Sequence, residues 1–291
     1  MKILVTGSKG FIGSRAIKVF GKENEVKGLD KLDGCDIADF KKITGEFTRF
    51  KPDCVIHCAA NGDIEFCENN RDEAVRNNII ATKNIASLCA KYDCTMVFCS
   101  TDHVYRYTKL PTGLREYNDI KGASFYGFTK AVCEQEIRSL VKKHFIARLC
   151  WQYGVFEKGM PQNEARIGLV EVAARALKKN KPVTVGKNSR QHISNVYDTI
   201  DVFRHMLDEK LPYGVYNVAS ENELTLKGLY SYIFKGMGAD DKKIKNLIIE
   251  QEGKPHILAA EPYYLKISGY KMPTFEEGFA RYLKEVHPTA V

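Results

Sequence analysis

The stretch TGSKGFIG, residues 6–13, constrains the fold of this chain more than any other segment. It follows the apolar run KILV and precedes a helical pattern, so it predicts a strand, a tight turn and a helix N-terminus. Gly7 permits the turn, Gly10 lets the backbone approach a pyrophosphate, and Gly13 allows close helix–strand packing. The helix N-terminus favours phosphate through its free N–H groups and its dipole. The residues expected to contact a dinucleotide here are Gly7, Gly10, Phe11, Ile12 and Gly13.

Strand and helix patterns alternate over the first 150 residues, which is typical of a doubly wound parallel sheet. The expected strands lie at 2–7, 25–30, 54–60, 95–101 and 145–150. After about residue 155 the alternation loosens into helices and short strand-like runs such as PVTV and GVYNVAS. We therefore expect an α/β fold, with a Rossmann-type dinucleotide-binding domain over 1–155 and a smaller mixed α/β substrate lobe over 156–291. The boundary is approximate, and segments after it can return to the first domain.

Acidic and small residues follow the strand ends at which a dinucleotide would lie. Asp30 ends the second strand, where a carboxylate accepts hydrogen bonds from an adenosine ribose, and a turn role is the alternative. In the next loop Asp36 is placed to reach the adenine amino group while Ile37 packs on the ring, and an N-cap or turn role for Asp36 stays equally open. The third strand ends in small residues where a cofactor must pass close to the backbone, namely Cys58, Ala59 and Ala60.

The fourth strand ends in STDHVY, at the edge where doubly wound sheets bind ligands. Thr101 is a candidate hydroxyl, Asp102 a candidate acid or orienting group, and His103 a neighbour whose role stays open. Taken alone, this stretch is equally consistent with a capped loop.

The segment FYGFTK opens the next helical pattern and places Tyr126 four residues before Lys130. Residues i and i+4 share a helix face, so the phenol and the ammonium should lie side by side. A lysine near a phenol lowers the pKa of the tyrosine and makes it a usable proton donor or acceptor. An isolated pair of this kind is more often a surface contact. A catalytic role therefore needs support from other motifs in the chain.

The nine cysteines lie between Cys35 and Cys150 and form no CxxC pair. Cys54 and Cys58 stand four residues apart in one expected strand, a span of roughly 13 Å that is too long for one metal ion. We therefore expect buried, reduced thiols and no metal site.

The net charge of +8 is spread along the chain, and its densest basic stretch, 178–190, has no interleaved aromatic residues. Nucleic acid is therefore not an expected partner. No apolar run approaches a membrane-spanning length, and the N-terminal MKILVTG reaches glycine too soon for a signal peptide. We expect a cytoplasmic protein without a membrane partner.

In this order, the glycine-rich turn, the acid after the second strand, the Ser/Thr after the fourth and the YxxxK pair resemble the extended short-chain dehydrogenase/reductase family. This resemblance covers about the first 155 residues, and it narrows toward the dTDP-4-dehydrorhamnose reductase branch. The segments similar to that branch are IEFCE, STDHVY, REYND and RLCWQYG, with fainter similarity at 192–198 and 254–279.

The resemblance implies NAD(P)-dependent reduction of a nucleotide-linked 4-keto sugar. Tyr126 would then donate a proton, Lys130 would lower its pKa and hold the nicotinamide ribose, and Thr101 would hydrogen-bond the carbonyl oxygen. Arg148 would offer donors to the substrate or form an ion pair at the sheet edge, and Trp151 would stack on the substrate or pack in the core. The expected substrate-binding residues are Thr101, Asp102, His103, Arg148 and Trp151.

Two other functions stay open. HCAA at the third strand is closer to sugar-nucleotide epimerases, whereas Asp102–His103 lacks the Asp–Glu pair of dehydratases. A catalytically silent, cofactor-binding regulatory subunit is the alternative from another class, and a homodimer stays open as well.

The sequence also bears on the coenzyme. Asp30 would repel the 2′-phosphate of NADP(H), so NAD(H) is favoured, while the neighbouring Lys31 keeps NADP(H) an option. Arg15, two positions past Gly13, is expected to face solvent rather than the ribose.

Overall fold

The structure is a computed structural model that describes residues 1–105, 113–122, 124–156, 168–209, 211–253, 257–258 and 260–286. The segment 254–279, which carries the fainter family resemblance, therefore lies outside the described residues at 254–256 and 259.

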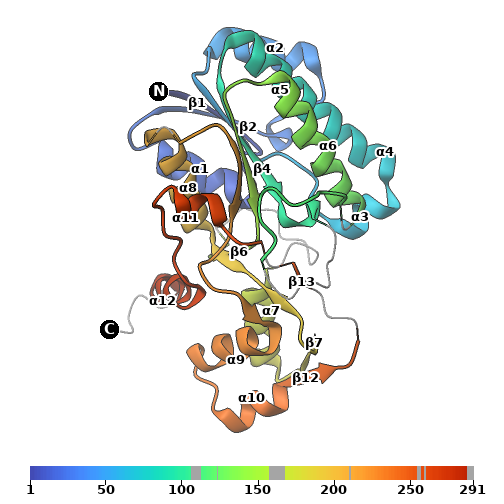
Figure 1. Cartoon of the computed structure of the whole chain (residues 1–291), viewed down its shortest axis with the longest axis vertical. Coiled ribbons are helices and arrows are strands. Elements are labelled where there is room, and N and C mark those ends of the chain that lie inside the picture. Colours follow the sequence, from blue (N-terminus) through green and yellow to red (C-terminus); the bar gives the residue numbers. More distant parts are fainter. Residues whose placement is uncertain are drawn as a thin grey trace.

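A six-stranded parallel sheet forms the centre of the upper lobe in Figure 1. The strand order is β10-β5-β4-β3-β1-β2, which confirms the predicted doubly wound sheet. The strands are β1 (Lys2–Thr6), β2 (Glu25–Leu29), β3 (Cys54–His57), β4 (Thr95–Thr101), β5 (His144–Leu149) and β10 (Gly214–Val218). Because all six run parallel, their carboxyl ends meet at one edge, and the loops that follow them share that edge.

Helices cover both faces of this sheet (Figure 1). Each face of the sheet is apolar and packs into its own core cluster. In β1, for example, Ile3 and Val5 belong to the cluster on one face and Leu4 to the cluster on the other. The first face is covered by α1 (Phe11–Phe20), α8 (Val196–Asp208) and α11 (Tyr263–Ile267). The second face is covered by α2 (Phe40–Phe50), α5 (Ala81–Tyr92) and α6 (Phe125–Leu140).

The helical region between β3 and β4 consists of several short pieces. These are α3 (Ile64–Asn69), α4 (Arg71–Ala74), a π-helical turn η2 (Val75–Ile80), and α5. The buried Asn78 in the π-helical turn accepts a hydrogen bond from Asn61 N at 2.7 Å and donates to Asn61 O at 3.1 Å and Thr129 Oγ1 at 3.0 Å. The break therefore lets one amide tie the loop after β3 to α6.

A smaller lobe has its own apolar core around Ile233, Phe234 and Phe279 and lies below the sheet in Figure 1. Its helices are α7 (Leu169–Lys179), α9 (Leu226–Gly236), α10 (Asp241–Leu247) and α12 (Phe275–Val286). Its short strands are β6 (Trp151–Tyr153), β7 (Val183–Gly186), β8 (Arg190–Gln191), β9 (Ile193–Asn195), β11 (Leu224–Thr225), β12 (Ile248–Gln251) and β13 (Ile257–Leu258).

The strand-like run GVYNVAS differs from the expected arrangement, because it does not belong to the small lobe. As β10 it pairs with β5, with Asn217 opposite Arg148, and forms one edge of the central sheet. Val215 and Val218 are buried in the two core clusters on opposite faces of the sheet, which is the burial that a sheet strand covered on both sides requires. The division at residue 155 stays a prediction, and the chain crosses back over it here.

Two further expectations concern thiols and membranes. All nine cysteines are free, and eight of them are buried, with Cys58 partly exposed. Within the described ranges, no helix combines the length and the apolar character needed to span a bilayer.

Candidate active site

A cavity of about 400 Å³ lies at the carboxyl ends of β1, β2 and β3, and we call it the glycine-loop cavity. The structure brings eight of the predicted cofactor residues to its wall: Gly7, Gly10, Asp30, Asp36, Ile37, Cys58, Ala59 and Ala60. The sequence interpretation missed Lys9, Asn61 and Asn77, which also line it. Lys9 lies inside the glycine-rich turn, which is the signal that could have identified it.

The glycines of this turn are required by close contacts. Gly7 has φ +64°, and a Cβ there would lie 2.8 Å from Ala59 N. A Cβ on Gly13 would lie 2.1 Å from Gly7 O, so only glycine lets α1 pack this closely on the turn. Gly10 caps α1 without a side-chain hydrogen bond, and the first turn of the helix carries no acidic residue. This cradle fits a phosphate at the helix N-terminus.

Asp30 has the turn role that the sequence left open, and it also lies at the predicted cofactor cavity. Its Oδ1 accepts a hydrogen bond from Leu32 N and its Oδ2 one from Lys9 N, both at 3.0 Å, so the carboxylate fixes the turn after β2. It also lines the glycine-loop cavity. A carboxylate has about four acceptor sites, so two bonds leave capacity for ribose hydroxyls.

Asp36 is held by protein groups. Its Oδ1 accepts from Ala38 N at 3.0 Å and its Oδ2 from the Arg76 guanidinium at 2.7 Å. Burial alone raises the pKa of Asp36, but the bonds from Arg76 and the Ala38 N–H outweigh it and hold the pKa below its ordinary value. This arrangement favours the turn alternative for Asp36, while Ile37 remains an apolar part of the cavity wall.

A second cavity of about 200 Å³ adjoins the first and shares Cys58 and Ala60 with it. We call it the catalytic cavity, because Thr101 from β4 and Tyr126 and Lys130 from α6 all line it. The end of β4 and the start of α6 thus bring these three predicted residues to one cavity. Other residues on its wall are Ile12, Gly62, Cys99, Ser100, Leu149, Cys150 and Gln152.

The protonation of Tyr126 differs from the expectation. Burial, followed by the charge of Asp102, raises the pKa of Tyr126 above its ordinary value, and the hydrogen bond with Thr101 opposes this only in part. Lys130 is fully buried, which lowers its pKa, and its Nζ donates to Cys99 O at 2.8 Å and lies over the Phe98 ring. The ammonium is therefore engaged by β4 rather than acting to lower the pKa of the phenol.

Thr101 lies between two neighbours on its own segment. Its Oγ1 accepts from His103 N and donates to Asp102 Oδ1, both at 3.2 Å, at the start of the 3-10 turn η3 (Asp102–Val104). Burial raises the pKa of Asp102 to about 7 and lowers that of His103 to about 4. The His103 and Tyr126 rings lie edge to face with centroids 6.2 Å apart.

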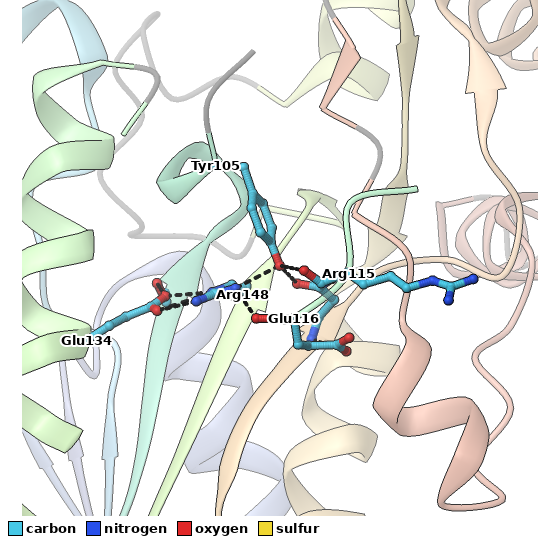
Figure 2. Close-up of polar contacts among 7 residues, drawn as sticks. Tyr105, Arg115, Glu116, Glu134 and Arg148 are labelled. Carbon is cyan, nitrogen blue, oxygen red and sulfur yellow. Dashed lines mark hydrogen bonds and ion pairs between the residues drawn. The ribbon is translucent and has the colours of Figure 1, made fainter. Parts of the chain in front are cut away.

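Arg148 forms a buried polar cluster instead of a substrate contact (Figure 2). Its guanidinium binds both carboxylate oxygens of Glu134 and donates to Tyr105 Oη at 2.8 Å and to Glu116 O at 3.1 Å. Ser100, on the wall of the catalytic cavity, donates to Glu134 at 2.6 Å. The ion-pair alternative describes this geometry, and Arg148 is not retained among the proposed substrate residues.

Two aromatic residues predicted near ligands have different surroundings. Trp151 is 39% exposed, so core packing does not account for it. Phe11 contacts Phe156 with ring centroids 5.0 Å apart and does not line either of the two cavities, whereas the next residue, Ile12, lines the catalytic cavity.

The solvent-facing position expected for Arg15 is wrong. Arg15 is only 1% exposed, because its guanidinium lies over the Phe11 ring and donates to Phe11 O at 3.0 Å and to Val155 O. It therefore connects the first helix to the segment after β6.

Comparisons with known proteins agree with this geometry. A family model described as the RmlD substrate-binding domain matches residues 1–286. A dTDP-4-dehydrorhamnose reductase from Mycolicibacterium smegmatis is 23% identical over 93% of this chain and 79% of its own length. Methionine adenosyltransferase 2 subunit beta from Xenopus laevis is 23% identical over 77% of this chain and 68% of its own. Among solved structures, a dTDP-4-dehydrorhamnose reductase from Bacillus anthracis in complex with NADP has the same fold, with a TM-score of 0.86, 23% identity, and coverage of 98% of this chain and 99% of that chain.

Proposed function

The chain belongs to the RmlD substrate-binding domain family, and we propose that it catalyses NAD(P)-dependent reduction of a nucleotide-linked 4-keto sugar, as dTDP-4-dehydrorhamnose reductases do. The observation that carries this proposal is the meeting of Thr101, Tyr126 and Lys130 in one cavity that adjoins the glycine-loop cavity. A dinucleotide that extends from one cavity to the other would bring its nicotinamide beside a proton donor.

The chain supplies binding and proton transfer. The glycine turn and the N-terminus of α1 would hold the phosphates of the coenzyme, Asp30 would accept from its ribose, and Ile37 would pack against its adenine. When bound, the reduced nicotinamide supplies the hydride that reduces the keto carbon. Tyr126 Oη donates a proton to the developing alkoxide, and Thr101 hydrogen-bonds the same oxygen.

The raised pKa of Tyr126 suits this direction of reaction. A phenol that keeps its proton at neutral pH is ready to donate, and the loss of that proton is favoured only as negative charge develops on the substrate oxygen. Lys130 contributes as a buried cation next to the site, and its fixed position on Cys99 O orients its remaining N–H groups.

The sugar nucleotide would lie over the open side of the catalytic cavity. The exposed ring of Trp151 offers a stacking face, while Asp102 and His103 lie next to the catalytic hydroxyl of Thr101. A cytoplasmic location and a homodimer stay predictions.

For the coenzyme, we propose a preference for NADH. The Asp30 carboxylate on the cavity wall supports it, because a 2′-phosphate there would meet a like charge. Lys9 and Lys31 line the same cavity, so the discrimination against NADPH should be moderate.

The test follows reduced-nicotinamide absorbance with a panel of nucleotide-linked 4-keto sugars. Stoichiometric consumption of coenzyme is expected. Isomerisation without net consumption would identify an epimerase instead. Tight coenzyme binding without turnover of any sugar would identify the catalytically silent, cofactor-binding subunit that the sequence left open.

A further inference from the structure

The carboxyl of Asp102 is buried next to Thr101 and is only partly hydrogen-bonded. This side chain is 1% exposed, and within the described part of the chain its Oδ2 has no hydrogen-bond partner. Its Oδ1 makes one side-chain contact, with Thr101 Oγ1 at 3.2 Å. Burial outweighs this bond and the backbone N–H groups of Asp102 and His103, so an ionised carboxylate is costly here, whereas a neutral carboxyl loses much less when one oxygen lacks a partner.

The groups that face Asp102 do not supply a compensating charge. They are Tyr126 from α6, Cys150 from the segment between β5 and β6, and His103 on its own turn. Burial raises the pKa of Tyr126, raises that of Cys150 to about 12 and lowers that of His103 to about 4, so all three are uncharged at neutral pH.

The hydrogen bonds of Thr101 can be counted. A hydroxyl donates once and accepts twice, and one acceptor site of Oγ1 is filled by His103 N. If Asp102 is ionised, the single hydroxyl proton of Thr101 points to Oδ1, and Thr101 can only accept in its hydrogen bond with Tyr126 on the wall of the catalytic cavity. If Asp102 is protonated, it donates to Thr101, both acceptor sites of Oγ1 are then filled, and the Thr101 proton is available to Tyr126 Oη or to a substrate oxygen in the cavity.

We propose that Asp102 is a positioning residue, and that Thr101 donates to the substrate carbonyl oxygen only while Asp102 carries a proton. This inference rests on the proposed reduction of a keto group. Asp102 acts through Thr101 and transfers no proton to the substrate, so its role differs from that of a general acid.

The main experiment measures the single-turnover rate of NADH oxidation by a nucleotide-linked 4-keto sugar between pH 5.5 and 9. For the wild type, the rate should fall about tenfold per pH unit above the Asp102 titration, because the fraction that is protonated falls by that factor. Asp102→Asn offers a permanent N–H donor of nearly the same shape. Asp102→Asn should not show this fall in rate at high pH, which we call the alkaline limb, and its rate at pH 6 should stay within about tenfold of the wild type.

Two further variants separate the explanations. Thr101→Val should be about a hundredfold slower at pH 6 and should also lack the limb, because the relay to the substrate is gone. Asp208→Asn, a change at an exposed carboxylate on α8, should retain the wild-type limb. A limb that persists in Asp102→Asn, or one that persists in Thr101→Val, would overturn the proposal.

A second readout needs no turnover. Carbon-13 NMR of the aspartate carboxyls in the NADH complex, assigned with Asp102→Asn, should show Asp102 protonated at pH 6. Thr101→Val should move its titration to higher pH, because the ionised form loses its donor. A fully ionised Asp102 at pH 6, or a titration that Thr101→Val leaves unchanged, contradicts the proposal. If both expected results appear while no keto sugar is reduced, the coupling between the Asp102 proton and Thr101 stands, and the proposed function fails together with the role of Thr101 toward a carbonyl oxygen.

Discussion

The guanidinium of Arg148 donates to both carboxylate oxygens of Glu134, and neither side chain is more than 2% exposed (Figure 2). Removing one partner leaves an uncompensated charge in the core. We expect Arg148→Met to lower the free energy of unfolding by about 3–5 kcal/mol, measured by urea denaturation at pH 7.

The second partner provides the control for this prediction. Combining Arg148→Met with Glu134→Gln should recover most of the loss, because the charge is then removed from both sides. Arg175→Met, which breaks an exposed pair with Glu171, should cost only about 0.3–0.5 kcal/mol. Equal losses at the buried and the exposed pair would contradict the structure of this cluster.

Tyr126→Phe tests the proton donor. Tyr126 lines the catalytic cavity and does not line the glycine-loop cavity. Turnover should fall at least about a hundredfold with little change in the coenzyme dissociation constant. Tyr117→Phe, which removes a hydroxyl from a ring that is 60% exposed, serves as control and should keep full activity. Near-wild-type turnover by Tyr126→Phe would refute the mechanism.

Coenzyme selectivity depends on Asp30. The wild type should bind NADH more tightly than NADPH, and Asp30→Ala should reduce the difference, as read from both dissociation constants. Since Asp30 also accepts from Lys9 N and Leu32 N, Asp30→Asn is the matched variant that retains an acceptor and removes the charge. If both variants leave the selectivity unchanged, a group other than Asp30 distinguishes the ribose 2′-hydroxyl of NADH from the 2′-phosphate of NADPH.

His57 should make the fold sensitive to acid. Its ring is fully buried between Thr6 and Thr82, with contacts of 2.6 and 2.9 Å, and burial lowers the pKa of His57 to about 3. Because the unfolded chain binds this proton near pH 6.5, the stabilisation is complete above pH 6.5 and is lost as pH falls toward 3. By pH 4.5 the loss should reach about 2–3 kcal/mol.

The measurement for His57 compares urea denaturation at pH 7 and pH 4.5. The variant His57→Gln should lose less stability than the wild type over this interval, whatever its stability at pH 7. An identical loss in both proteins would mean that the His57 ring does not resist protonation.

The local parts of the fold and the site could be predicted from the sequence. Gly7 and Gly13 act through contacts within their own turn and the adjacent strand end, and the five apolar runs report strand burial directly. What depends on distant partners could not be read in this way. Glu134 carries no sequence signal that it neutralises Arg148, and the high pKa of Tyr126 follows from burial that only the assembled fold creates. Asn217 likewise lies opposite Arg148 only after β10 has returned to the sheet.

That return of β10 has a consequence for synthesis on the ribosome. When residues 1–155 have emerged, five strands of the sheet are available, but β5 is an open edge with unpaired backbone groups. The edge stays open until Val218 has left the exit tunnel, and at about 5–20 residues per second the remaining chain takes several seconds to follow. During that interval the nascent protein exposes a hydrophobic strand edge to its neighbours. Chaperone dependence and aggregation of ribosome-stalled chains should therefore fall sharply once the stall position lies beyond β10.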